Sequence, residues 1–137
     1  MVVASYAAFN RGDLDALLEL YTEDCAWDIT RWPGADAVIP GRYEGHEGLA
    51  GVLEDFSTLT RPWGAALAEF EQVLDLGEGR FWVEGRIRFA TPAGDAELFD
   101  RWIQLIRMRD RRIAEIVMYW DVDEARRDAG LDEVPRR

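Results

Sequence analysis

Five ionisable side chains stand where the sequence could use them as acids, bases or ligand anchors: Asp28, His46, Asp100, Arg101 and Tyr119. Asp28 interrupts an apolar stretch, where burial would raise the pKa of its carboxyl and suit it to proton transfer. The alternative for Asp28 is an outward-facing carboxylate that pairs with an arginine or with water. His46 is the single histidine, so it alone has an unperturbed pKa near neutrality. Its alternative role is to begin a helix.

Alternation along two expected strands divides further candidates between opposite faces. Asp100 and Arg101 are adjacent, so one of them should line an interior and the other should meet solvent or a partner. Tyr119 and Asp121 should share one face, with Met118 and Trp120 on the other. We expect Asp121 to cap a following helix.

The motifs of several enzyme classes are absent from the sequence. The chain has no lysine, which excludes Schiff-base chemistry. We find no glycine-rich phosphate loop, no serine nucleophile elbow and no paired cysteines. One histidine and one cysteine do not make a tetrahedral metal site without several carboxylates. We therefore expect no metal and no cofactor, and chemistry that relies on acid and base groups alone.

Composition and charge indicate which classes of partner and which cellular setting to expect. The chain has 137 residues and a formal net charge of −11, and an acidic chain without a basic patch is a poor partner for nucleic acid. No apolar run reaches the roughly 20 residues of a membrane span, and no signal-peptide core is evident. The single Cys25 cannot form an internal disulfide, so we expect a buried thiol in a reducing cytoplasm.

Apolar periodicity predicts helices first and a run of strands afterwards. Leu49, Val52, Leu53 and Phe56 recur at helical spacing after His46. Alternation over residues 80–90, where Phe81, Val83, Ile87 and Phe89 are apolar, predicts a strand with one wet face. The full prediction is helices within residues 1–11, 14–21, 46–60 and 123–129, and strands at 23–30, 66–76, 80–90, 96–108 and 112–121, with a possible short strand at 42–44.

This element order predicts one α+β domain over residues 1–131, followed by a frayed tail at 132–137. Helices should pack on one face of an antiparallel sheet. The last two strands carry apolar residues on both faces, as expected if the second face meets a partner subunit.

Three segments carry a resemblance to a known family. The first runs from Tyr6-Ala7-Ala8-Phe9-Asn10-Arg11-Gly12-Asp13-Leu14 to Tyr21-Thr22-Glu23-Asp24. The second is Tyr43-Glu44-Gly45-His46-Glu47-Gly48-Leu49, and the third runs from Arg112-Ile113 through Tyr119-Trp120-Asp121 to Ala129-Gly130-Leu131. Together they resemble SnoaL-like proteins of the nuclear transport factor 2-like superfamily.

The resemblance implies a cone-shaped α+β barrel, in which a strongly bent antiparallel sheet and three helices enclose a pocket, with a short C-terminal helix. It also implies a homodimer through the outer sheet face. Members include polyketide cyclases, steroid isomerases, epoxide hydrolases and non-catalytic binding modules, so the fold does not fix the activity.

The catalytic patterns of these branches are not intact here. The aspartate that the cyclases and the limonene-type epoxide hydrolases carry on the last strand falls on Met118, which cannot accept a proton. The isomerase base falls on Ile29, one place from Asp28, and a one-residue offset turns a strand side chain to the other face. The isomerase tyrosine falls on Ser5, one place from Tyr6.

Two hypotheses follow. The chain is a cofactor-independent acid/base enzyme of cyclase, isomerase or hydrolase type that acts on a small hydrophobic metabolite, or it is a non-catalytic module that binds a small ligand or only dimerises. Both need a largely apolar pocket. Its predicted lining consists of Trp27, Ile29, Tyr43, Phe56, Trp102, Met118 and Trp120.

Overall fold

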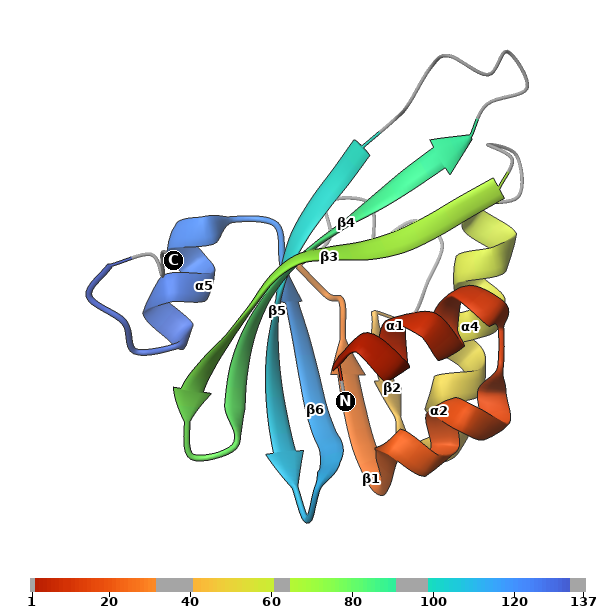
Figure 1. Cartoon of the computed structure of the whole chain (residues 1–137), viewed down its shortest axis with the longest axis horizontal. Coiled ribbons are helices and arrows are strands. Elements are labelled where there is room, and N and C mark those ends of the chain that lie inside the picture. Colours follow the sequence, from red (N-terminus) through yellow and green to blue (C-terminus); the bar gives the residue numbers. More distant parts are fainter. Residues whose placement is uncertain (1, 32–40, 61–64, 91–98, 134–137) are drawn as a thin grey trace.

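The computed structural model describes residues 2–31, 41–60, 65–90 and 99–133. Within these ranges the chain forms four helices and one six-stranded sheet (Figure 1). The elements are α1 Val2–Arg11, α2 Leu14–Leu20, β1 Tyr21–Asp28, β2 Arg42–Glu44, α4 Gly45–Thr60, β3 Ala65–Gly77, β4 Arg80–Ala90, β5 Phe99–Arg109, β6 Arg112–Tyr119 and α5 Val122–Asp128.

The sheet has the strand order β2-β1-β6-β5-β4-β3. Strands β3 to β6 form the expected antiparallel meander, but β1 pairs with β6 in parallel. The prediction of a wholly antiparallel sheet was therefore wrong. A short hairpin can join only antiparallel strands. No hairpin joins β1 to β6, because most of the chain lies between them, so no local pattern in the sequence sets their relative direction. The strong bend and the pocket beneath the helices stay predictions.

Local sequence sets the limits of the short helices as expected. The side chain of Asp13 accepts a hydrogen bond from the Ala16 N–H at the start of α2. The Asp121 carboxylate accepts hydrogen bonds from the backbone N–H groups of Asp123 and Glu124 in the first turn of α5. After α5, Gly130 takes a φ of 73°, a left-handed conformation that glycine adopts without a steric cost.

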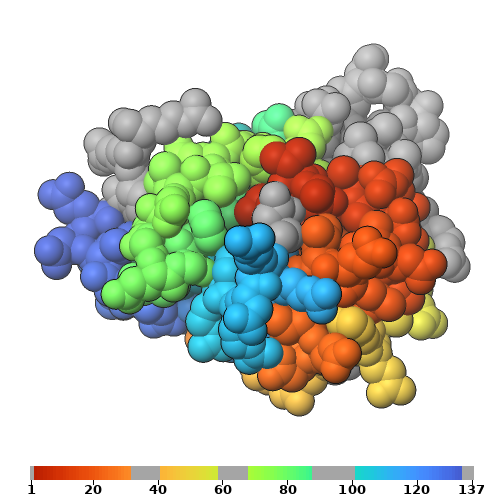
Figure 2. Space-filling view, turned by 60° about the horizontal axis from the view of Figure 1, so that its bottom comes forward, coloured from red at the N-terminus to blue at the C-terminus, as the bar shows by residue number. Residues whose placement is uncertain are grey.

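The two faces of the sheet carry separate apolar clusters. We call the face beneath α1, α2 and α4 the inner face; Val83, Trp102, Ile106 and Met118 belong to its cluster. The opposite, outer face carries a smaller cluster under α5. Figure 2 shows the strands of the meander between α5 on one side and α1 with α2 on the other. The sheet is thus a wall between two environments.

The outer face of β4 is less wet than its alternation predicted. Trp82 lies on that face and is 0% exposed, because α5 covers it together with Ile103 and Tyr119. The apolar residues on both faces of β5 and β6 are therefore explained in part within the chain, by α5.

None of the helices in the described ranges is long and apolar enough to cross a bilayer.

Arg31 fastens α5 to the end of β1. Its guanidinium lies 3.4 Å from Glu124 and 3.7 Å from Asp128, both on α5. It also lies over the ring of Tyr119, 4.8 Å from the centroid, and the Tyr119 hydroxyl donates to Asp128 at 2.8 Å. Charge pairing thus supplements the small apolar contact beneath α5.

Asp121→Ala removes the N-cap of α5 and should lower the free energy of unfolding by about 1 kcal/mol. Urea unfolding measures the loss, and hydrogen exchange should accelerate most in the amides of α5. Glu54→Ala, at an exposed position of α4, is the control and should stay within about 0.5 kcal/mol of the wild type. Unchanged exchange in α5 would contradict the capping role.

Candidate functional site

The residues predicted to line a pocket come together on the inner face. Trp27, Tyr43, Trp102 and Met118 are buried members of its cluster, each less than a tenth exposed. Ile29, Phe56 and Trp120 are partly buried and pack against the same cluster. All seven therefore share one environment, although they come from β1, β2, α4, β5, β6 and the segments that follow β1 and β6.

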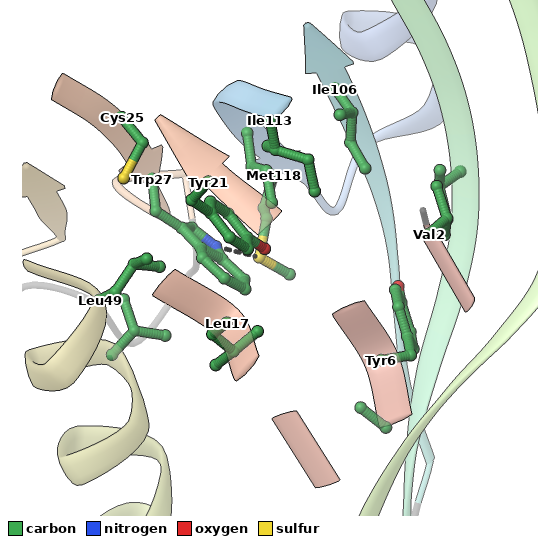
Figure 3. Close-up of a cluster of buried hydrophobic side chains, with 14 of the residues drawn as sticks. Val2, Tyr6, Leu17, Tyr21, Cys25, Trp27, Leu49, Ile106, Ile113 and Met118 are labelled. Carbon is green, nitrogen blue, oxygen red and sulfur yellow. Dashed lines mark hydrogen bonds between the residues drawn. The ribbon is translucent and has the colours of Figure 1, made fainter. Parts of the chain in front are cut away.

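Met118 accepts a hydrogen bond from a tryptophan. The resemblance assigns this position to the aspartate of two enzyme branches. The indole N–H of Trp27 donates to the Met118 sulfur at 3.1 Å (Figure 3). A thioether is only a weak acceptor and has no proton to exchange. The Trp27 N–H therefore has a hydrogen-bond partner, and the pair supplies neither an acid nor a base.

A polar triad lies farther along the inner face, and sequence reasoning did not single it out. The hydroxyl of Tyr6 on α1 donates to Oε1 of Gln104 at 2.7 Å and accepts from the indole N–H of Trp102 at 3.3 Å. Gln104 is 3% exposed. One signal was available: Gln104 is the polar residue between Trp102 and Ile106 in the alternation of β5. Only the packing of α1 on the sheet reveals Tyr6 as its partner.

Gly85 makes room for this triad. It pairs with Trp102 across the β4–β5 ladder. A Cβ at this position would lie 2.4 Å from Nε1 of Trp102 and 2.6 Å from the Tyr6 hydroxyl oxygen. Both distances are well below van der Waals contact, so the close approach of the triad to β4 depends on the missing side chain.

The phenols of the inner face stay protonated. Burial raises the pKa of Tyr6 to about 12, against a smaller lowering by the hydrogen bond from Trp102. Burial also raises the pKa of Tyr21, whose hydroxyl shares a hydrogen bond with Ser5 at 2.9 Å. These groups can donate hydrogen bonds at neutral pH but do not serve as bases.

Asp28 lies on the outer face, as in the alternative interpretation of its sequence position. Its Oδ2 is 3.6 Å from Arg31 and 3.6 Å from Arg42, and its Oδ1 accepts bonds from the backbone N–H and the hydroxyl of Thr30. Partial burial raises the pKa of this carboxyl, but the Thr30 bonds and the two arginines outweigh it and hold the pKa below its usual range. Asp28 is therefore a charged tether between the two ends of the 29–41 segment.

Tyr119 and Arg101 also lie away from the inner face. Tyr119 belongs to the cluster under α5. The Arg101 side chain is 67% exposed and lies 3.5 Å from Glu71. Asp100 pairs with Ile87 in the β4–β5 ladder, but its side chain lies outside the described residues.

His46 stands at the start of α4 and contacts backbone, as the helix-entry interpretation expects. Its Nε2 is 3.3 Å from the carbonyl oxygen of Tyr21, which fixes the first turn of α4 to the start of β1. Cys25 is buried, and burial raises the pKa of its thiol. Within the described ranges, no three histidine, cysteine, aspartate or glutamate side chains gather as metal ligands do.

Gly85→Ala should lower the free energy of unfolding by about 1–3 kcal/mol, because the new methyl group collides with Trp102 and Tyr6. Urea unfolding checks the change. Trp102→Phe removes the nearest clashing atom, so Gly85→Ala should cost at least about 0.5 kcal/mol less in that background. An equal cost in both backgrounds would show that the collision is not the cause.

Asp28→Asn should lower the free energy of unfolding at pH 7 by on the order of 1 kcal/mol, because it removes the charge that faces two arginines. A lowered pKa in the folded state means that this stabilisation is complete above the unfolded pKa of about 3.9 and is lost as the pH falls through the folded value. The difference from wild type, measured by urea unfolding, should therefore shrink below about pH 4.

Glu19→Gln, at an exposed position of α2, is the matched control for Asp28→Asn and should change stability little at either pH. A difference between wild type and Asp28→Asn that persists at pH 2 would speak against the ion pairs and for a packing effect.

Comparisons with known proteins fit this architecture. The structure of TerC co-crystallised with polyporic acid has a TM-score of 0.70 at 19% identity, covering 94% of this chain and 95% of that one. A protein from Catenulispora acidiphila with a ketosteroid isomerase-like fold, in complex with trimethylamine, has a TM-score of 0.64 at 17% identity, covering 98% and 96%. An epoxide hydrolase of M. tuberculosis that is similar to the limonene type has a TM-score of 0.61 at 15% identity, covering 89% and 80%.

At these identities the likeness to solved structures concerns the fold alone. The chain matches no curated protein sequence at a significant level. The model of the SnoaL-like domain matches residues 2–116, which is most of the chain. The chain therefore belongs to the SnoaL-like domain family.

Proposed function

We propose that this protein binds a small, neutral, largely apolar molecule at the inner face of its sheet, beneath α1, α2 and α4. One observation carries the proposal: the polar side chains that are buried at this face are neutral hydrogen-bonding groups. They include the triad of Tyr6, Gln104 and Trp102, the pair of Tyr21 and Ser5, and the pair of Trp27 and Met118. A few such groups within an apolar and aromatic lining are typical of small-molecule sites.

Aromatic rings support the same ligand class. Phe9 packs against Trp27 and, edge to face at 4.8 Å, against Phe56, and Tyr21 stacks on Trp27 with ring centroids 6.1 Å apart. Flat apolar molecules gain both from burial and from contact with such rings. Two structural neighbours were crystallised with small molecules, TerC with polyporic acid and the Catenulispora acidiphila protein with trimethylamine.

Cofactor-independent acid/base catalysis on a hydrophobic metabolite is the second candidate. It is favoured by Tyr6, a buried phenol on the inner face that can donate a hydrogen bond to developing negative charge. Asp28 does not serve as its base, because it is paired with arginines on the outer face, and the carboxylate of Asp55 already accepts a hydrogen bond from Tyr43 of the inner cluster at 2.6 Å. Turnover of a substrate panel that Tyr6→Phe abolishes and Asp28→Asn preserves would favour catalysis over binding alone.

A homodimer through the outer face belongs to the same proposal, in a cytoplasmic setting that keeps Cys25 reduced. Leu74, Leu105 and Val117 are half-buried on that face beside the cluster under α5, and a second copy would cover them. A symmetric pair is the commonest oligomer of soluble proteins. Light scattering over a range of protein concentrations distinguishes a dimer from a monomer.

Three bicyclic probes of nearly equal size test ligand binding: indene, indole and 1-indanone. At least one should bind the wild-type protein with saturation, because burial of an apolar ring system drives the association. Met118→Trp fills the inner face and should weaken binding at least about tenfold, by overpacking. Ligand-observed NMR titration gives the dissociation constants.

Val117→Trp is the matched control, since Val117 is the neighbour of Met118 on β6 and belongs to the outer cluster. Its probe affinities should stay within about twofold of wild type. Thermal unfolding confirms that both variants are folded. Equal weakening by the two substitutions, or no saturable binding of any probe to the wild type, would contradict the proposal.

A further inference from the structure

Gln104 is a polar side chain almost wholly enclosed in the apolar inner face. It lies on β5 between Val83 of β4 and Met118 of β6, which are its direct partners across the two ladders. Neither neighbour offers its amide a strong hydrogen bond, and the Met118 sulfur already accepts from Trp27. A buried amide without partners is costly, so the bonds that Gln104 does make decide what it can still recognise.

The triad fixes the direction of every hydrogen bond in it. An indole N–H can only donate, so the Tyr6 oxygen is the acceptor of the bond from Trp102. The Tyr6 hydrogen is then available to Gln104, whose Oε1 accepts it at 2.7 Å. A reversed amide would give the Tyr6 oxygen two donors and leave its own hydrogen enclosed without an acceptor, at the cost of an unmade bond.

The NH₂ group of Gln104 is left over by this arrangement. Among the described residues, none accepts a hydrogen bond from Nε2. Nε2 is nevertheless absent from the described polar atoms that are both fully enclosed and unbonded, so it keeps a small accessible surface. Gln104 as a whole is only 3% exposed. The free donor therefore lies on a side chain that is almost wholly buried at the inner face, beside the Tyr6 hydroxyl.

We propose that Nε2 of Gln104 is the specificity-determining donor of the inner face, which selects ligands carrying a hydrogen-bond acceptor such as a ketone or ether oxygen. The inference rests on the proposed ligand binding and adds the polarity of the ligand. A ligand with only a donor would have to share Oε1 with Tyr6, which already uses one of its two lone pairs, whereas an acceptor meets an unused N–H. Tyr6 and Trp102 act as positioning residues that hold the amide in this orientation.

The three probes test the polarity directly, because 1-indanone carries only an acceptor, indole carries only a donor and indene carries neither. Wild type should bind 1-indanone about three- to tenfold more tightly than indene, the worth of one net hydrogen bond. Indole should gain less than 1-indanone, because it would have to share Oε1 with Tyr6. Ligand-observed NMR titration gives the three dissociation constants under identical conditions.

Two variants separate the donor from its positioning. Gln104→Leu removes the donor, so the preference for 1-indanone over indene should fall to within about twofold while both probes still bind. Tyr6→Phe releases the amide to turn over, so indole should gain and approach 1-indanone. A purely structural role of Tyr6 would weaken all three probes together. Thermal unfolding verifies that each variant is folded.

The outcomes distinguish the two proposals. Equal binding of the three probes to wild type, or a preference for indole, overturns the donor assignment and leaves the binding site standing. A 1-indanone preference that survives Gln104→Leu also overturns it. Failure of all three probes to bind wild type overturns the proposed function itself, and the assignment with it.

Discussion

The parallel pairing of β1 with β6 determines which side chains meet the inner face. Trp27 lies opposite Ile116 and Asp28 opposite Val117, so Trp27 joins the buried cluster and Asp28 turns outward. Because side chains alternate along a strand, a slip of one residue would exchange them. The ladder also brings Trp27 to the Met118 sulfur. Asp28 meets Arg42 through the antiparallel ladder with β2 and meets Arg31 three residues along the chain. Asp28, the carboxylate that the sequence offered as a catalytic base, is therefore paired with arginines on the outer face. The inner face keeps its apolar character.

Neutral polar groups replace charges at the inner face. An ion buried there would need a partner to offset the loss of hydration, whereas Tyr6, Gln104 and Trp102 form a chain of two directed bonds that leaves only the NH₂ group of Gln104 without a partner among the described residues. This chain fits against β4 because Gly85 has no side chain. The arrangement suits recognition by hydrogen-bond direction, which depends little on pH because the phenol stays protonated.

Ion pairs lie on the outer face of the sheet, whereas the buried polar side chains of the inner face are neutral. Arg31 contacts three carboxylates from β1 and α5, and Arg86 and Arg101 contact glutamates of β3. Such pairs are partly solvated and contribute modestly each. Those of Arg31 with Glu124 and Asp128 supplement the apolar contact that α5 makes over Trp82. One sheet thus separates an outer face that combines ion pairs with a small apolar cluster from an apolar, aromatic inner face.

The sequence by itself determined the class of fold and grouped the apolar residues that meet at the inner face. Periodicity and capping residues such as Asp13 and Asp121 are local signals, so they identified the elements, although β1 runs over Tyr21–Asp28 and not over 23–30. The alternation of the last strands correctly joined Met118 with Trp120 and separated Tyr119. Tertiary structure alone decided the parallel direction of β1, the outward turn of Asp28, the burial of Trp82 under α5 and the meeting of Tyr6 with Gln104. These features join residues far apart in the chain, and strand register and helix placement depend on packing between such residues, which no local pattern records.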